Sequence, residues 1–223
     1  MSKLILIPTP IGNLGDITLR AIETIKTCDF LYAEDTRTTL NLLKHLQIEK
    51  KLFSFHINNE HKVLQNAISH IQQATMVGLV SDAGTPAISD PGFLLVRACI
   101  QNNIDVETLP GPTAFVPALV NSGFPCDRFC FEGFLPVKKG RTTRLKELSE
   151  EKRTVILYES PHRLEKLLIQ IYEMMGAEKE ICVCREISKL YEETRRGHVS
   201  ELLEHFKANP ARGEIVVLLR GCS

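Results

Sequence analysis

Apolar runs typical of buried strands alternate with amphipathic segments through the first half of the chain. Five short runs rich in aliphatic and aromatic residues predict strands over residues 4–9, 30–35, 51–56, 75–81 and 105–109. Between them, apolar positions three and four residues apart predict helices over residues 17–27, 59–73 and 91–102. Such alternation indicates an α/β fold, with a parallel sheet covered by helices on both faces.

The pattern starts again after the turn-forming stretch Gly123-Phe-Pro125. Strands are expected over residues 129–135, 154–158, 181–186 and 214–219, with helices over 141–151, 161–175 and 201–208. No repeat, low-complexity tract or long linker interrupts the sequence. We therefore expect two α/β domains, residues 1–124 and 125–223, with a ligand in the cleft that they share.

The loop after the fourth predicted strand is the most informative stretch of the chain. It runs Ser81-Asp-Ala-Gly-Thr-Pro-Ala-Ile-Ser-Asp-Pro-Gly92 and combines glycine, proline and acidic residues. Asp90 followed by Pro91 predicts the N-cap and first position of the next helix. An ordinary capped loop does not explain Asp82 and its small neighbours directly beyond the strand, where ligands of open parallel sheets bind. The sequence therefore predicts a ligand-binding loop here.

The first loop narrows the chemistry of that ligand. Pro8-Thr-Pro-Ile-Gly-Asn-Leu-Gly15 follows the first strand but contains neither of the glycine patterns that bind dinucleotides or nucleoside triphosphates. Pro8 and Pro10 each lack the backbone N–H on which a phosphate cradle depends. S-adenosylmethionine, which has no phosphate, suits such a loop. The stretch Pro110-Gly-Pro-Thr-Ala114 predicts a further tight turn that opens a helix.

Composition excludes several classes of protein. A formal net charge of zero gives no global field that would attract nucleic acid. The seven cysteines include no C-x-x-C pair and the seven histidines do not cluster, so we expect reduced thiols and no metal site. No apolar run approaches the length that spans a membrane, and no cleavable signal pattern precedes the first strand. A cytoplasmic protein without membrane association is expected.

Eight stretches together carry a resemblance to a known family. They are Ile7-Pro-Thr-Pro-Ile-Gly-Asn-Leu-Gly-Asp-Ile-Thr18, Ala33-Glu-Asp-Thr-Arg37, residues 81–92, Pro110-Gly-Pro-Thr-Ala114, Phe131-Glu-Gly-Phe-Leu-Pro136, Tyr158-Glu-Ser-Pro-His-Arg163, Arg185-Glu-Ile-Ser-Lys189 and Gly213-Glu-Ile-Val-Val217. With these stretches, the chain resembles the ribosomal RNA methyltransferase branch of the tetrapyrrole methylase superfamily from residue 4 to residue 219. Many members continue into a small C-terminal extension.

The resemblance implies a fold, a reaction and a set of donor contacts. The expected fold has a parallel doubly wound N-terminal sheet and a mixed C-terminal sheet, with S-adenosylmethionine in the cleft and two copies forming a homodimer. The expected reaction is 2′-O-methylation of a cytidine in the decoding region of 16S rRNA in the small ribosomal subunit. Carried over position by position, the donor contacts are Pro10, Ile11, Asp82, Thr85, Thr113, Ala114, Phe134, Tyr158 and Gly213.

Methyl transfer from a sulfonium needs positioning more than it needs a nucleophile. A base that removes the hydroxyl proton contributes typically about 10²–10⁴-fold to the rate. Asp35, next to Glu34 at the end of the second strand, and Glu159, at the matching place in the second domain, are the candidate acidic residues. Arg37 is a candidate phosphate contact. The alternative is that Asp35 and Arg37 only cap a helix and pair with each other.

Two other functions remain open at this stage. A small-molecule methylase of the tetrapyrrole type would keep the donor site and change the acceptor cleft, and the neutral charge favours it. A non-enzymatic domain that binds S-adenosylmethionine as a sensor is the other possibility. Lys138, Lys139, Arg141 and Arg144 form the densest basic run, which is either an RNA contact or a solvated helix face that also carries glutamates.

Overall fold

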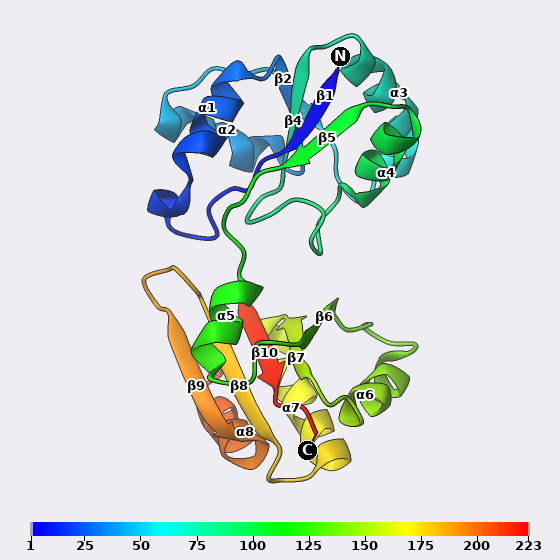
Figure 1. The fold of residues 1–223 in the computed structure, drawn as a ribbon. Coiled ribbons are helices and arrows are strands. Elements are labelled where there is room, and N and C mark those ends of the chain that lie inside the picture. Colours follow the sequence, from blue (N-terminus) through cyan, green and yellow to red (C-terminus); the bar gives the residue numbers. More distant parts are fainter. Residues whose placement is uncertain (1, 223) are drawn as a thin grey trace. The chain divides into compact units, whose positions relative to one another are not determined.

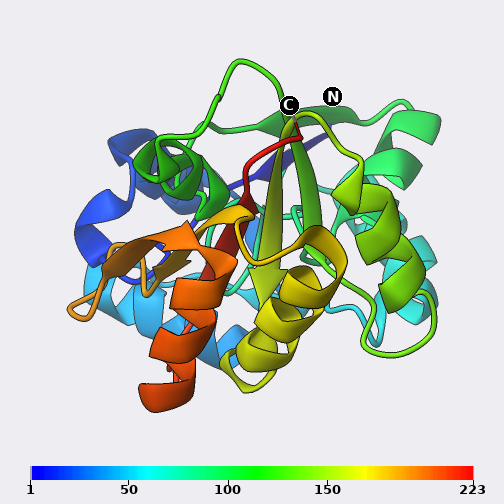
Figure 2. The same cartoon turned by 90° about the horizontal axis from the view of Figure 1, so that it is seen from below.

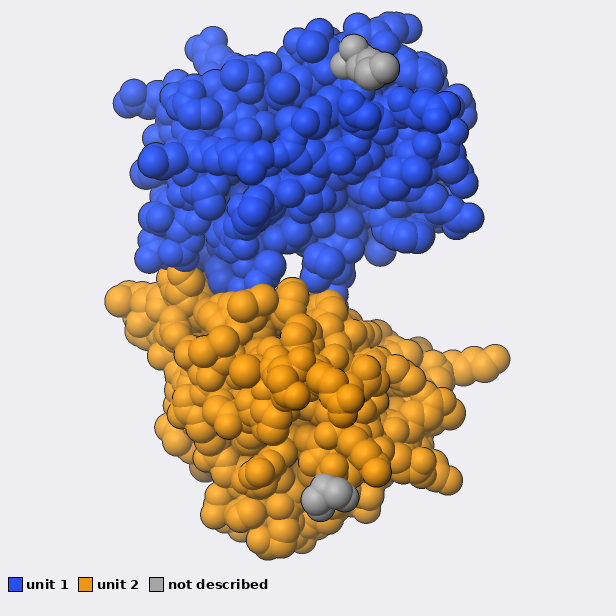
Figure 3. Space-filling model, viewed as in Figure 1, with its two compact units in different colours: residues 1–113 blue, residues 114–223 orange. Residues whose placement is uncertain are grey.

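The computed structural model describes residues 2–222 and divides into two compact units, Met1–Thr113 and Ala114–Ser223 (Figure 3). The sequence placed the boundary later, at residue 124. Helix α5 (Phe115–Ser122) accounts for the difference, because it packs against strands β8, β9 and β10 of the second unit. Each unit is described separately below.

The first unit contains a parallel sheet of five strands in the order β3-β2-β4-β1-β5 (Figure 1). Each predicted strand of this half coincides with an observed one, and every neighbouring pair is parallel. The strands are β1 (Lys3–Leu6), β2 (Phe30–Ala33), β3 (Leu52–Ser54), β4 (Met76–Val80) and β5 (Asp105–Thr108).

Helices cover both faces of this sheet, as a doubly wound fold requires. One apolar cluster joins Ile5 of β1 to Ile25 and Leu43 of the helices on one face, whereas Leu4 and Leu6 belong to a cluster on the other face. The short helix η1 (Leu14–Asp16) precedes α1. The first cluster involves α1 (Leu19–Thr27) and α2 (Thr36–Leu46), and the second involves α3 (Glu60–Gln72) and α4 (Phe93–Gln101).

The start of α4 differs from the sequence prediction. The helix begins at Phe93 with Gly92 as its N-cap, so the expectation that Asp90 caps it and Pro91 opens it is wrong. Gly92 has φ 135°, and a Cβ on it would lie 2.8 Å from Leu79 Cδ2. The loop therefore turns tightly against β4 before the helix can start.

The second unit contains a mixed sheet, as expected, and its strand order is β6-β7-β10-β8-β9. β6 and β7 are parallel and the remaining neighbours are antiparallel. The strands are β6 (Phe129–Phe134), β7 (Thr154–Glu159), β8 (Glu180–Arg185), β9 (Glu193–His198) and β10 (Ile215–Leu219). The sequence analysis missed β9, an edge strand with the polar sequence ETRRGH.

The central strand β10 is buried on both faces. Ile215, Val217 and Leu219 belong to the main apolar cluster of the unit. This cluster includes residues of α6 (Arg141–Ser149), α7 (Pro161–Met175) and α8 (Val199–Ala208), which lie on one face of the sheet (Figure 2). Helix α5 packs on the other face. Across residues 2–222, no helix is both long and apolar enough to cross a membrane.

Candidate functional site

Loops that follow β1 and β4 are joined directly at the carboxyl edge of the first sheet (Figure 1). The backbones of Thr9 and Gly84 exchange two hydrogen bonds, each 2.9 Å long. The Thr9 hydroxyl also donates to the carbonyl of Ser81 at 3.1 Å, and both of these side chains are buried. The two predicted ligand loops therefore form one connected structure.

The loop after β5 joins the same structure. The Thr85 hydroxyl donates to the carbonyl of Pro112 at 3.1 Å. Gly111 lies so close to Pro8 that a Cβ on it would be 2.5 Å from the proline Cβ. The structure thus brings together the loops that carry five of the predicted donor contacts: Pro10, Ile11, Asp82, Thr85 and Thr113. Ala114, the next predicted contact, is the N-cap of α5.

This edge offers few backbone donors to a phosphate. Pro8 and Pro10 have no N–H, and the Thr9 N–H between them already donates to Gly84. The Gly84 N–H in turn donates to Thr9. Ile11 adds a buried apolar side chain. The loops therefore fit a ligand with apolar and hydrogen-bonding parts better than a nucleotide phosphate.

Three carboxylates meet where β2 and β4 end side by side. One oxygen of Asp82 accepts a hydrogen bond of 3.1 Å from the backbone N–H of Asp35. The Asp82 backbone N–H donates to Glu34 Oε2 at 3.3 Å. The acidic residues at the end of the second strand are thus tied to the ligand loop after the fourth strand.

The environments of these carboxylates shift their pKa values in opposite directions. Burial raises the pKa of Glu34 above its usual value, partly offset by the hydrogen bond from Asp82. Burial likewise raises the pKa of Asp82. Hydrogen bonds from the Arg37 side chain and backbone instead lower the pKa of Asp35 to about 2. Glu34 and Asp82 are therefore better proton acceptors than Asp35.

Asp35 and Arg37 form a fork at the start of α2. The guanidinium donates to Asp35 through Nε at 3.0 Å and through Nη2 at 2.6 Å. Asp35 also accepts from the Arg37 backbone N–H at 2.8 Å, which makes it the N-cap of the helix. The capping and pairing considered as an alternative are therefore present. The Arg37 side chain is nevertheless 89% exposed, so it can also contact a ligand.

In the second unit, two predicted contacts lie side by side at the carboxyl ends of parallel strands. Phe134 of β6 pairs in register with Tyr158 of β7, and their rings are 5.6 Å apart in an edge-to-face arrangement. Phe131 packs on Tyr158 at 5.1 Å and on Phe115 of α5 at 4.8 Å. Phe134 is 53% exposed. The strand ends therefore present a partly exposed aromatic surface.

Gly213, the remaining predicted contact, lies just before β10. It has φ 83°, and a Cβ on it would lie 2.2 Å from the Glu186 carboxyl group. That carboxylate accepts from the Glu214 backbone at 2.9 Å and from Lys189 Nζ at 2.9 Å. The conformation and the close approach both require glycine at this position.

Glu159, a predicted catalytic residue, lies inside a buried network. Its side chain is 1% exposed and that of Arg141 is 4% exposed, with 2.8 Å between Glu159 Oε2 and Arg141 Nη2. The other Glu159 oxygen accepts from Arg163 Nε and from the Ser160 backbone, both at 2.8 Å. Arg141 Nε donates to Gln170 at 2.9 Å, while its Nη1 has no partner among residues 2–222. This geometry suits a structural role.

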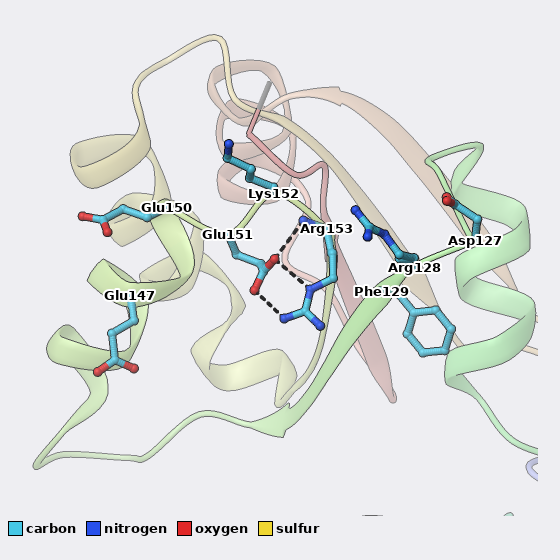
Figure 4. A pocket seen from close by; sticks show the side chains of 8 residues that line it. All are labelled: Asp127, Arg128, Phe129, Glu147, Glu150, Glu151, Lys152 and Arg153. Atoms are coloured by element: carbon cyan, nitrogen blue, oxygen red, sulfur yellow. Dashed lines mark hydrogen bonds and ion pairs between the residues drawn. The ribbon is translucent and has the colours of Figure 1, made fainter.

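A wide hollow of about 800 Å³ elsewhere in the second unit contains none of the predicted site residues (Figure 4). Its lining mixes charges of both signs, and Glu151 and Arg153 bind each other through hydrogen bonds of 2.8 and 2.9 Å. The lining therefore shows no preference for an anionic or a cationic ligand. Among residues 2–222, no three His, Cys, Asp or Glu side chains are grouped as metal ligands.

The sequence did not predict the environments of two residues. Glu34 was placed with Asp35 at the ligand edge but not chosen as a catalytic residue, although its partial burial makes it the better proton acceptor. Arg141 was grouped with a basic run on the surface, although it is buried against Glu159. The signal for Glu34 was its place at the strand end. No local pattern distinguishes Arg141 from the neighbouring cations.

Comparisons with known proteins agree on the family. A family model described as Tetrapyrrole (Corrin/Porphyrin) Methylases matches residues 3–203. The chain is 45% identical over 221 residues to Ribosomal RNA small subunit methyltransferase I of Thermotoga maritima, and the matched region covers 99% of each chain. It is 45% identical over 222 residues to the protein of the same name in Escherichia coli O157:H7, with 98% of this chain and 78% of that one covered.

Solved structures with low sequence identity show the fold alone. Uroporphyrin-III-C-methyltransferase from Thermus thermophilus matches with a TM-score of 0.68 at 17% identity, covering 98% of this chain and 94% of that one. Diphthine synthase matches with a TM-score of 0.75 at 12% identity, covering 98% and 90%. The same fold, with both α/β units, thus occurs in proteins with different names.

Proposed function

The chain belongs to the tetrapyrrole (corrin/porphyrin) methylase family, and on this premise we propose that it methylates 16S rRNA with S-adenosylmethionine as the methyl donor. The proposed acceptor is the ribose 2′-oxygen of a cytidine in the decoding region. The observation that carries the proposal is the position of Asp82, which lies in the connected ligand loops and also accepts a hydrogen bond from Asp35 at 3.1 Å. The residues proposed for the donor side and for the acceptor side are therefore in contact.

The three connected loops of the first unit are proposed to hold the donor. Asp82 would receive the ammonium of its amino-acid end, and Pro10, Ile11, Thr85 and Thr113 would contact the rest. Ala114, the first residue of the second unit, is proposed as a further contact. The sulfonium supplies an activated methyl group and leaves as a neutral thioether. The absence of free backbone donors at Thr9 and Gly84 supports a ligand without phosphate.

Phe134, Tyr158 and Gly213 of the second unit are also proposed as donor contacts. The exposed face of Phe134, together with Tyr158, suits an adenine ring or a sulfonium cation, because aromatic faces bind both. Gly213 would contribute backbone atoms, since the contact with Glu186 leaves no room for a side chain.

On the acceptor side, we propose that Glu34 accepts the proton of the ribose hydroxyl. Its pKa, raised by burial, makes it a stronger base than Asp35, whose pKa is about 2. Asp35 is then the residue that orients Arg37, and Arg37 contacts an RNA phosphate. Glu159 is proposed to act indirectly, by positioning Arg163 through their contact of 2.8 Å.

The chain is 45% identical, over nearly its whole length, to proteins named ribosomal RNA small subunit methyltransferase I, and this favours rRNA over a tetrapyrrole as the acceptor. With a net charge of zero, the chain has little nonspecific attraction to phosphate. We therefore propose that its substrate is an assembled small subunit recognised by shape, that it acts in the cytoplasm, and that it works as a homodimer.

Two experiments test the proposal. Calorimetry should detect binding of S-adenosylmethionine and its demethylated product, but not of ATP or NAD. Ribose methylation mapped on small-subunit rRNA from cells with and without the gene should differ at one decoding-region cytidine. Binding of ATP or NAD in place of S-adenosylmethionine, or identical methylation maps, would refute the proposal.

A further inference from the structure

A cavity of about 250 Å³ lies within the first unit, between the first loop and α2. Pro10 and Leu14 line it from the first loop, while Asn41, Leu42 and His45 line it from the helix. Asn41 and His45 are four residues apart, so they lie on the same face of α2. Asp82 lines the cavity where the loop after β4 begins.

The cavity lies next to the proposed donor contacts but is distinct from most of them. It shares Pro10 and Asp82 with that set, whereas Thr85, Thr113 and Ala114 do not line it. Much of its lining comes instead from α2, the helix that Asp35 caps. Its place therefore matches the acceptor side of the proposed reaction.

The size of the cavity limits what it can hold. Pockets for drug-sized ligands measure about 300–1,000 Å³, so this one is too small for the whole donor and suits a single heterocycle. Pro10, Leu14 and Leu42 provide apolar walls on which a flat ring can pack. Enzymes that modify a base take the extruded base into such a pocket and bind its Watson–Crick edge, and a ribose-modifying enzyme can select its nucleotide in the same way.

The polar groups of the lining match cytosine. The Asp82 carboxylate is an acceptor, and one of its oxygens already binds the Asp35 backbone. The Asn41 amide offers both a donor and an acceptor. Cytosine presents its N4 amine donor next to the ring acceptor N3 and the carbonyl acceptor O2, and carboxylates accept from that amine. Uracil presents an oxygen at the same place, which the carboxylate would repel.

We propose that this cavity binds the cytosine base of the acceptor nucleotide, extruded from the rRNA. Asp82 accepts from the exocyclic amine, and Asn41 donates to a ring acceptor. Because Asp82 also contacts Glu34 through a hydrogen bond of 3.3 Å, the attached ribose is brought to the proposed base. This inference rests on the proposed function and adds the group that selects the nucleotide.

A nucleotide titration tests the cavity without turnover. Cytidine 5′-monophosphate is added to the isotope-labelled protein with the demethylated donor product present, and NMR follows the Asn41 amide and the His45 ring. Both signals should shift, and uridine 5′-monophosphate should bind about tenfold more weakly. Unshifted signals at saturating nucleotide would overturn the inference. So would weaker binding of cytidine monophosphate with the donor product present than in a second titration without it, because the cavity would then belong to the donor.

Matched variants extend the test to the reaction. Asn41→Ala and the cavity-filling Leu42→Trp should each weaken cytidine monophosphate binding and methyl transfer to small subunits at least tenfold, with donor affinity unchanged. Lys44→Ala, on the same helix but outside the lining, is the control. Asn41→Ala keeps the test valid if Leu42→Trp does not fold. Unaltered binding and transfer by Asn41→Ala would refute the inference.

The two proposals fail in different ways. If the wild-type protein transfers no methyl group to rRNA, the proposed function is wrong, and the nucleotide titration still decides what the cavity binds. If the wild-type protein methylates a ribose while the cavity variants do so equally well, only the cavity assignment is wrong.

Discussion

The Asp82 carboxylate accepts a hydrogen bond of 3.1 Å from the backbone N–H of Asp35, a residue 47 positions earlier in the chain. The return contact, from the Asp82 N–H to Glu34 Oε2 at 3.3 Å, closes the connection between the two strand ends. Adjacent parallel strands β2 and β4 make this contact possible, since their carboxyl ends lie at the same edge. Asp82 is therefore expected to affect donor and acceptor binding together.

Two substitutions at Asp82 distinguish the role of its charge from the role of its hydrogen bond to Asp35. Asp82→Ala should weaken donor binding by about 1–3 kcal/mol, the cost of leaving the donor's ammonium without its hydrogen-bonding partner in the bound complex. Asp82→Asn can still accept from the Asp35 N–H, so it should retain loop structure while losing the charge that receives the donor's ammonium. Calorimetry with S-adenosylmethionine measures both. Equal donor affinity in folded Asp82→Ala would remove this residue from the donor site.

Glu34→Gln should slow methyl transfer by about 10²–10⁴-fold, the usual contribution of a general base. Because burial raises the Glu34 pKa, the wild-type rate should fall as the pH drops through that raised value. The acidic limb of the pH–rate profile should be absent in Glu34→Gln and present in Asp35→Asn. Single-turnover rates on small subunits at several pH values measure it. An unchanged acidic limb in Glu34→Gln would exclude Glu34 as the base.

Arg37→Ala should reduce methyl transfer to rRNA while leaving donor affinity nearly intact, because Arg37 lies on the proposed acceptor side. The same change should raise the Asp35 pKa from about 2 towards its ordinary value. A carboxyl group with a lowered pKa stabilises the fold at higher pH and loses that contribution as the pH falls towards 2. Carboxyl NMR titration measures the pKa. Arg37→Lys, which keeps the charge but cannot make both guanidinium hydrogen bonds to Asp35, is the matched variant. Full methyl transfer by Arg37→Ala would contradict the assignment of Arg37 to the acceptor side.

Glu159→Ala should lower the free energy of unfolding by about 3–5 kcal/mol, because it leaves Arg141 buried without its partner. Arg141→Leu combined with Glu159→Leu should recover part of that loss, as expected for a buried ion pair. Urea denaturation followed by circular dichroism measures each variant. Wild-type stability together with lost activity in Glu159→Ala would instead make Glu159 a catalytic residue.

The strands and ligand loops could be predicted because their signals are local. Period-two and continuous apolar runs mark strands, and glycine, proline and aspartate mark the loops that follow them. Strand β9 was not predicted because its residues Glu193–His198 are polar. An edge strand does not need alternating apolar residues. The cap of α4 was wrong because the close approach of Gly92 to Leu79 is a tertiary contact that the sequence does not show.

The chemistry of adjacent residues was harder to predict than their position. Glu34 and Asp35 are consecutive carboxylates, yet burial raises the pKa of one and Arg37 lowers the pKa of the other. Arg141 and Arg144 belong to one basic run, yet Arg141 is buried against Glu159 while Arg144 binds Glu132 and Glu147 closer to the surface. Such differences depend on partners distant in the sequence.

The central claim is that the methyl group reaches a ribose 2′-oxygen of small-subunit rRNA. The most direct measurement is transfer of tritium from methyl-labelled S-adenosylmethionine to small subunits that lack the modification, followed by alkaline hydrolysis of the rRNA. A 2′-O-methyl ribose blocks cleavage at its own 3′ side, so the account predicts label in an alkali-resistant dinucleotide that begins with cytidine. Label in ordinary mononucleotides, which places the methyl group on a base, or no transfer to subunits at all would contradict it.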